Sequence, residues 1–227
     1  MLAAALVAAS ITLAAALLCG RQARRAAAWR AGLLSECAAR LDAARLGRDR
    51  AGFATLDGGH DGAPVAVRLI PEALVHRRLP QLWLSVSLRL PLPVEATLNV
   101  LRRPAGAEFY APADLPRRFD PPSGWSADTL VRGTPGAEAL LRPIAPILAD
   151  ILADPRIKEV LVTPRGLRLV VQAAEGGRGA YLLLRGSRFD LDHVAPALLD
   201  GTLDAARQLA QALSRTRSEP IAHARAA

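Results

Sequence analysis

The feature that most constrains this chain is an apolar run at its beginning that is followed at once by arginines. Residues 1–19, MLAAALVAASITLAAALLC, contain no charged side chain, and Ser10 and Thr12 are the only polar ones. A helix of about 20 apolar residues crosses the roughly 30 Å hydrocarbon core of a bilayer. We therefore expect residues 1–19 to form a transmembrane anchor, with the lipid bilayer as its partner.

Two other interpretations of this segment stay open. A secretory signal carries basic residues before its apolar stretch, whereas here the arginines come after it. A lipidated cysteine at Cys19 is disfavoured because Leu18 stands where a small residue is expected. An uncleaved anchor is the preferred interpretation, and a domain released outside the cytoplasm by signal cleavage is the alternative.

The basic residues after the apolar run predict an orientation. Four arginines occur in the ten residues 21–30, and they are the candidate membrane-surface contacts: Arg21, Arg24, Arg25 and Arg30. Positively charged flanks stay in the cytoplasm, and each guanidinium near anionic headgroups contributes about 1 kcal/mol. The chain is therefore predicted to be a single-pass protein of the cell inner membrane with its C-terminal domain in the cytoplasm.

The net charge of +8 does not indicate a nucleic-acid partner. Residues 21–50 hold eight arginines against three acidic residues, whereas residues 51–203 hold 17 basic and 16 acidic residues. A nucleic-acid surface needs a concentrated basic face with stacking aromatics, and here the excess lies beside the apolar run. Of the 29 basic residues only Lys158 is lysine, and this bias toward arginine, together with abundant alanine, is typical of a GC-rich bacterial genome.

Residues 20–50 are predicted to form a juxtamembrane basic helix. Apolar residues recur every three or four positions over 21–47, at Trp29, Leu33, Cys37, Leu41 and Ala44, which gives one apolar stripe. This stripe could bind a protein partner or a second copy of the chain. We expect Trp29 to pack against its own domain or a neighbouring copy.

Residues 51–215 are predicted to form one cytoplasmic α+β domain, followed by a disordered tail over 216–227. Strands are expected at 53–56, 65–70, 82–92, 96–103, 158–163, 167–172 and 180–185, because apolar residues alternate or cluster there between turn signals. In 82–90 the apolar residues Leu82, Leu84, Val86, Leu88 and Leu90 fall on one side. Two helices are expected to cover one face of the resulting antiparallel sheet or sheets.

The first of these helices should start at a Thr134 cap and break near Arg142, because Pro143 and Pro146 each lack a backbone donor. The second should start near Asp192, with Pro196 in its first turn. The order of elements allows two similar helix-plus-meander halves, 51–103 and 130–215. The connection 104–129 holds four aromatic residues, Phe109, Tyr110, Phe119 and Trp125, so we expect it to pack down on the sheet.

No motif in the chain predicts catalysis, a cofactor or a metal. His60 and Asp61 lie in GGHDG between two expected strands, and a turn is the preferred interpretation. EGGRGA at 175–180 is interpreted as a hairpin turn, since a phosphate-binding loop would be followed by a helix. We therefore predict a non-catalytic binding, scaffolding or regulatory domain. The alternative is a membrane-tethered enzyme whose site assembles from distant residues.

Overall fold

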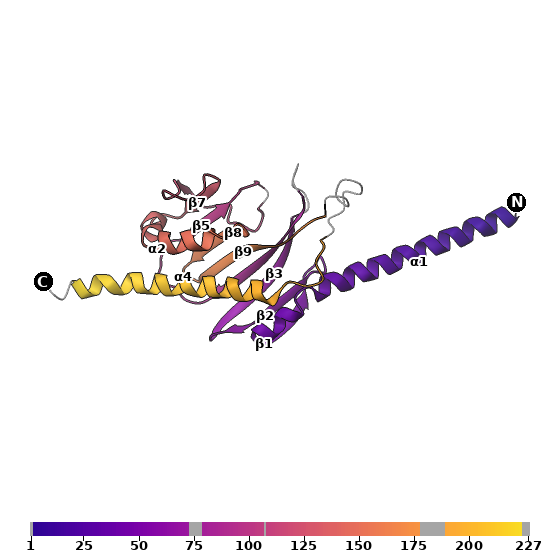
Figure 1. Ribbon diagram of the computed structural model, residues 1–227, viewed down its shortest axis with the longest axis horizontal. Helices are drawn as coiled ribbons and strands as arrows, with labels where there is room; N and C mark the ends of the chain where they lie inside the picture. The colour runs from indigo at the N-terminus through magenta and orange to yellow at the C-terminus, as the bar shows by residue number, and fades with distance from the viewer. Residues whose placement is uncertain (1, 73–78, 107, 178–188, 224–227) are drawn as a thin grey trace.

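The computed structural model describes the backbone of residues 2–72, 79–106, 108–177 and 189–223 and, outside residues 2–8 and 216–223, their side chains. The elements follow in chain order (Figure 1): α1 (Leu2–Gly32), the 3-10 helix η1 (Glu36–Arg40), β1 (Asp42–Arg48), β2 (Ala54–His60), β3 (Ala63–Glu72), β4 (Gln81–Arg89), β5 (Leu98–Arg102), β6 (Arg117–Phe119), β7 (Thr129–Gly133), α2 (Ala137–Leu152), β8 (Ile157–Thr163), β9 (Gly166–Glu175) and α4 (Pro196–His223).

The strands in the described part of the chain form one nine-stranded antiparallel sheet. Their order is β1-β2-β3-β4-β9-β8-β5-β7-β6. The early strands β1 to β4 join the late ones where β4 pairs with β9, over nine residue pairs from Gln81–Glu175 to Arg89–Gly166. The predicted α+β class with an antiparallel sheet is confirmed. The two suggested halves lie in one continuous sheet instead of two separate meanders.

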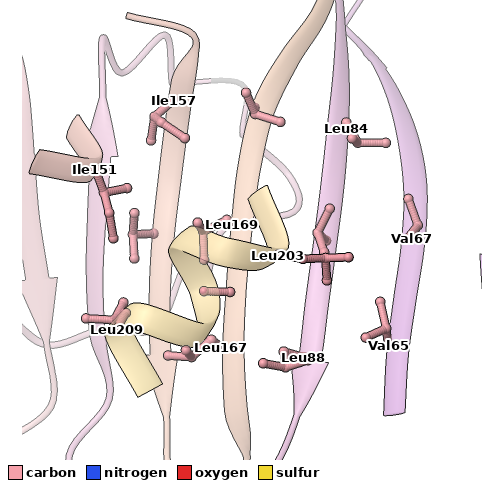
Figure 2. Close-up of a cluster of buried hydrophobic side chains, with 14 of the residues drawn as sticks. Val65, Val67, Leu84, Leu88, Ile151, Ile157, Leu167, Leu169, Leu203 and Leu209 are labelled. Carbon is pink, nitrogen blue, oxygen red and sulfur yellow. The ribbon is translucent and has the colours of Figure 1, made fainter. Parts of the chain in front are cut away.

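One face of this sheet packs against α2 and α4 and holds the main core. The alternation predicted for 82–90 is confirmed, because Leu82, Leu84, Val86 and Leu88 all lie in the main buried cluster. Figure 2 shows Leu203 and Leu209 of α4 among the strand residues Leu84, Leu88 and Leu169. Helices therefore cover this face, as predicted.

The helix that begins the chain is shorter than expected. It ends at Gly32, so the helix predicted over 21–47 is wrong beyond that residue. Leu33 and Leu34 are fully buried, and residues 42–48 pair with β2 as strand β1. Burial and strand pairing outweigh the helix propensity of the sequence DAARLGR in β1. The helix on which a partner or a second copy was expected to bind therefore ends at Gly32, and the association itself stays a prediction.

The last turns of α1 are fixed to the body by Trp29. Its indole Nε1 donates to the Leu191 carbonyl at 2.5 Å, and its ring stacks on Phe189 with centroids 6.4 Å apart. The ring edge also meets Phe53 at 6.3 Å. The expectation that Trp29 packs against its own domain is confirmed. On the N-terminal side of Trp29, α1 projects away from the body (Figure 1).

Among the described residues, no helix combines the length and the apolar character needed to cross a membrane. The transmembrane span expected over residues 1–19 stays a prediction.

The connection between β5 and α2 is more ordered than predicted. It contains the short strand β6 and the strand β7, which pairs with β5 and β6. Phe119 and Trp125 pack against the main core, which confirms that this segment packs down. Phe109 is the exception, because it is 78% exposed.

Helix α2 corrects two expectations. It runs unbroken through Pro143 and Pro146, because Leu141, Ile144 and Leu148 are buried in the core and hold it on the sheet. Its N-cap is Gly136 with a φ of 89°. The hydroxyl of Thr134 instead accepts a hydrogen bond from the backbone N–H of Thr97 at 2.9 Å. It therefore links the segment after β7 to the residue just before β5.

Helix α4 begins at Pro196, which confirms a proline in the first turn, but this is later than the start predicted near Asp192. It continues to His223, past Arg215, where the disordered tail was expected to begin. Extending a helix needs no new nucleus and is easier than starting one. The strand expected at 180–185 and the second half of the turn at 175–180 lie outside the described residues.

Gly166 provides a test of the β8–β9 hairpin. Its φ is +142°, and a Cβ there would clash with the carbonyl oxygen of Leu88. We expect Gly166→Ala to lower the free energy of unfolding by more than about 1 kcal/mol.

Gly201 is the matched control, because it lies in α4 and a Cβ there meets nothing within 4 Å. Gly201→Ala should raise stability by about 0.5–1 kcal/mol. Urea denaturation of both variants checks this, and equal stabilities would contradict it.

Candidate binding site

The face of the sheet opposite α2 and α4, here called the polar face, carries most of the buried charged groups. In β4 this face bears Trp83 and Ser85, both about 5% exposed. The alternation in this strand is typical of a half-buried strand with one solvated face, but residues after β5 cover the second face: Lys158 on the sheet contacts both Glu108 and the Arg103 carbonyl. A second, smaller buried layer therefore lies on the side away from the helices.

Two irregularities in strand pairing shape the polar face. The β8–β9 register shifts between Ile157 and Glu159, and the β4–β9 register shifts between Leu82 and Trp83. Such bulges re-aim side chains and are frequent beside functional sites. Because of the first bulge, the side chains of the neighbours Lys158 and Glu159 both lie on the polar face. A regular strand would send them to opposite faces.

Lys158 is the most deeply buried cation of the polar face, with only 2% of the residue exposed. Its Nζ donates to the Glu108 carboxylate and to the Arg103 carbonyl, both at 2.7 Å, and lies 5.6 Å from the Trp83 ring centre. Burial acts to raise the pKa of Glu108, but hydrogen bonds from Lys158 and from the Ala105 N–H outweigh it and lower the pKa. This ion pair fastens residues 103–108 to the sheet.

Glu159 anchors a second buried network. Arg168 donates to its carboxylate at 2.9 and 3.1 Å, and the Asn99 amide donates at 2.7 Å. Arg132 reaches Asn99 Oδ1 at 3.4 Å. Burial raises the pKa of Glu159, and the charge of Arg168 opposes that rise. A buried carboxylate with this many donors is a fixed part of the structure.

Two oxygen atoms of the polar face, one on Glu72 and one on Tyr110, differ from these, because they have no hydrogen-bond partner among the described residues. Glu72 is 7% exposed, and its Oε2 accepts from Trp83 Nε1 at 2.6 Å, but its Oε1 is buried and unpaired. The Tyr110 hydroxyl is also buried and unpaired. Burial raises the pKa of Tyr110 well above its usual range, and the nearby carboxylates of Glu72 and Glu159 add to this, so the phenol stays neutral.

A cavity of about 280 Å³ lies on the polar face. Residues of β3, β4, β8, β9 and the segment after β5 line it: Glu72, Gln81, Trp83, Arg103, Ala105, Lys158, Gln172 and Glu175. It combines an aromatic ring, carboxylates and amides in a small volume, and this is the usual make-up of a site for a small polar ligand. We take this cavity as the candidate binding site.

The arginines predicted to contact a membrane surface occupy two environments. Arg21, Arg24 and Arg25 are exposed on the projecting part of α1. Arg30 is half-buried, and its guanidinium carbon lies 5.8 Å from the Phe53 ring centre. The role of all four at a lipid surface stays a prediction, and Arg30 has a packing contact with the body as well.

His60 and Asp61 lie at the β2–β3 hairpin, as the turn interpretation requires. Asp61 and Gly62 form its two-residue turn, with φ values of 50° and 78°, which matches the mirror-image turns of tight hairpins. Arg207 of α4 contacts His60 and pairs with Asp61 at 2.7 Å. This long-range pairing has no sequence signal.

The remaining candidate ligands do not converge. The described residues contain no group of three or more His, Cys, Asp or Glu side chains that could hold a metal ion. Cys19 and Cys37 are both free thiols, and burial raises the pKa of Cys37 to about 11. His193 pairs with Glu36 at 3.0 Å.

Sequence reasoning missed the cavity residues Glu72, Trp83 and Lys158. A signal was nevertheless present, because the only lysine stands beside Glu159 inside an otherwise apolar strand, IKEVLVT. Lysine and glutamate are almost never fully buried unless they are paired. That pattern indicates a buried ion pair but does not identify its partners.

Comparison with known proteins adds one structural likeness. No protein-family model matches the chain, and no curated protein matches it either. Among solved structures, the crystal structure of the mycobacterial trehalose monomycolate transport factor A, TtfA, is 13% identical. The match covers 70% of each chain with a TM-score of 0.42. At this TM-score the resemblance establishes neither a family nor a function for this chain.

Proposed function

We propose that this chain is a non-catalytic binding protein anchored to the cytoplasmic face of the inner membrane by the first part of α1. The observation that carries the proposal is the exposure of apolar side chains on a helix that leaves the body. Ile11, Leu13, Leu17 and Leu18 are 58–64% exposed. Exposed leucines of this density on a helix need a covering partner.

The apolar character of this segment extends around the whole helix. In residues 11–19 the only polar side chain is Thr12, so no solvated face remains. A helix that is hydrophobic on all sides is buried in a large core or in a bilayer. At 1.5 Å per residue, residues 2–19 span about 27 Å, close to the roughly 30 Å hydrocarbon core. The side chains of residues 2–8 belong to this proposed span and lie outside the described part of the structure.

The charges beside this segment support the same arrangement. Arg21, Arg24 and Arg25 are exposed immediately after it, where headgroup phosphates would lie. Retention of positive flanks in the cytoplasm gives the proposed orientation. The attachment of α1 through Trp29 then holds the body close to the membrane.

The proposal of binding rather than catalysis is supported by the pairing on the polar face. Lys158 pairs with Glu108, and Arg168 pairs with Glu159, so these groups serve the structure. The cavity lined by Glu72, Trp83 and Lys158 has room for a small ligand. This arrangement favours recognition of a bound molecule over transfer of a proton or a nucleophilic attack.

Flotation of the full chain with vesicles of phosphatidylethanolamine and phosphatidylglycerol tests the anchor. The chain should float with the vesicles and resist extraction by alkaline carbonate. Leu13→Asp combined with Leu17→Asp should abolish flotation, because an Asp at the helix centre costs about 3 kcal/mol on insertion. Leu46→Asp is the matched control, since Leu46 is 51% exposed on β1 and should not affect flotation.

Two outcomes would overturn the anchor. One is extraction of the intact parent chain by carbonate, and the other is unchanged flotation of the double Asp variant. Orientation is tested separately with protease added to sealed spheroplasts. Protection of the body supports a cytoplasmic domain, whereas digestion contradicts it. A new amino terminus after residue 19 would instead support signal cleavage.

A further inference from the structure

Three arginines on the hairpin formed by β1 and β2 carry charge that the fold does not use. Arg45, Arg48 and Arg50 are all exposed, and the described residues place no carboxylate in an ion pair with any of them. Asp57 lies opposite Arg45 in the strand register, but it is bound by Arg68 at 2.8 and 3.0 Å. These three charges are therefore left for a partner outside the chain.

The turn of this hairpin is built without the arginine side chains. The acidic residue of the turn is Asp49, and its Oδ1 accepts hydrogen bonds from the backbone N–H groups of Ala51 and Phe53 at 2.9 and 2.8 Å. Such a side-chain bond to the backbone closes a turn by itself. The local fold therefore accounts for Asp49 and leaves the arginines beside it without a structural role.

The turn lies beside the part of α1 that enters the body. A Cβ on Gly52 would lie 3.6 Å from Arg30 Nε, and the Phe53 ring contacts both Arg30 and Trp29. Figure 1 shows β1 and β2 near the end of α1. The hairpin arginines and Arg30 therefore belong to one basic surface at the entry of α1.

The proposed bilayer is close enough to attract this surface. From residue 19 to Arg30, α1 rises by about 16 Å, and the headgroup layer takes about 5–7 Å of that rise. The remaining distance of about 10 Å is close to the Debye length of about 8 Å at physiological ionic strength, and long arginine side chains shorten it. Attraction between basic segments and anionic lipids acts over this range.

A second segment at the entry of α1 carries the opposite charge. Asp190 and Asp192 are exposed on either side of Leu191 in the sequence, and the Leu191 carbonyl accepts from Trp29. Anionic headgroups attract the hairpin arginines and repel these carboxylates. The body should therefore lean with the hairpin toward the bilayer, and a helix tilt of about 20° is ordinary for a membrane span.

We infer that the β1–β2 hairpin is a second membrane contact, in which Arg48 and Arg50 bind the phosphates of anionic lipids. The inference builds on the proposed membrane location of the chain, because α1 holds the hairpin within reach of the surface. Nucleic-acid binding is disfavoured here, since the neighbouring aromatic rings of Trp29 and Phe53 pack on each other and bases need a free ring for stacking.

Fluorescence quenching by lipid tests this contact in the full chain. A bimane label is attached to Ala51→Cys in a Cys19→Ser background, and the fully buried Cys37 stays unlabelled. The chain is reconstituted in phosphatidylcholine vesicles that contain a headgroup nitroxide lipid, with or without phosphatidylglycerol. Phosphatidylglycerol should raise the quenching by about twofold or more. Sodium chloride at about 1 M, where the Debye length is about 3 Å, should remove the increase.

Two double variants with the same change of charge separate the hairpin from general charge effects. Arg48→Gln combined with Arg50→Gln should lose the quenching that depends on phosphatidylglycerol. Arg89→Gln combined with Arg165→Gln should keep it, because these residues lie at the other end of the strands, where Arg89 pairs with Gly166. All four arginines are exposed, so urea denaturation should give both double variants the stability of the parent.

The outcomes distinguish the hairpin contact from the anchor. The inference is overturned if a chain that floats with both kinds of vesicle is quenched equally with and without phosphatidylglycerol. It is also overturned if the variant lacking Arg48 and Arg50 is quenched as the parent is. Quenching that needs phosphatidylglycerol, in a chain that alkaline carbonate strips from the vesicles, supports the hairpin contact and overturns the anchor. A chain that floats with neither kind of vesicle overturns both.

Discussion

Replacing Lys158 by Met is expected to lower the free energy of unfolding by about 3–5 kcal/mol. The ammonium of Lys158 is buried with the Glu108 carboxylate, whose side chain is 5% exposed and 2.7 Å away. Met fills a similar volume but leaves that carboxylate buried without a counter-charge, and the segment from Arg103 to Glu108 loses its ion pair with β8. Urea denaturation followed by circular dichroism measures the change.

A second substitution separates the charge effect from packing. Lys158→Met combined with Glu108→Leu removes both charges and should recover most of the lost stability, because an apolar pair of similar volume can replace a buried ion pair. Arg156→Ala is the control, since its ion pair with Asp154 lies at the surface and should contribute less than about 1 kcal/mol. A loss in Lys158→Met no larger than in Arg156→Ala would contradict the role given to this lysine.

Replacing Trp29 by Ala is expected to lower the free energy of unfolding by about 3 kcal/mol. This is the lower end of the range for replacing a large aromatic residue by Ala, because Trp29 is only partly buried. The substitution removes the stack on Phe189, the edge contact with Phe53 and the hydrogen bond to the Leu191 carbonyl. Trp29→Phe keeps most of the ring packing and should cost about 1 kcal/mol for the lost hydrogen bond.

The same substitution should also loosen α1 from the body. Spin labels on Leu17→Cys and Leu46→Cys, placed in a background without the native cysteines, report the distance between α1 and β1. The distance distribution should broaden in Trp29→Ala and stay narrow in the parent. Phe109→Ala is the aromatic control, because Phe109 is 78% exposed and its loss should change stability by less than about 0.5 kcal/mol. Equal effects of Trp29→Ala and Phe109→Ala would show that Trp29 does not fix the helix.

Local patterns in the sequence predicted the centre of the fold well. The alternation over Leu82–Leu88 identified β4 and its core face, and Asp-Gly identified the β2–β3 turn. Both signals depend on residues adjacent in sequence. Strand β1 was missed because DAARLGR has no alternation and its structure comes from pairing with β2. Strand β7 was missed because only its pairing with β5 and β6 defines it.

The candidate site was beyond prediction for a related reason. Glu72, Trp83 and Lys158 come from three strands, and the order β3-β4-β9-β8 brings them together. A bulge at Lys158 then turns it to the polar face, and regular alternation would predict the opposite direction. The single lysine beside Glu159 in the sequence indicates a buried ion pair. The partner of Lys158 is Glu108, however, which lies 50 residues away in the chain.

If the proposed anchor is correct, the unbroken course of α1 from the apolar segment to Trp29 sets the distance between the membrane surface and the body. Residues 20–28 form about 13 Å of helix, and the ring of Trp29 fixes the point where that helix enters the fold. In the proposed arrangement, with residues 2–19 held in lipid, the near end of the body would stand over the bilayer at roughly the width of one helix. A single amphipathic peptide would fit into such a gap, whereas a folded globular partner would have to approach from the sides or from above.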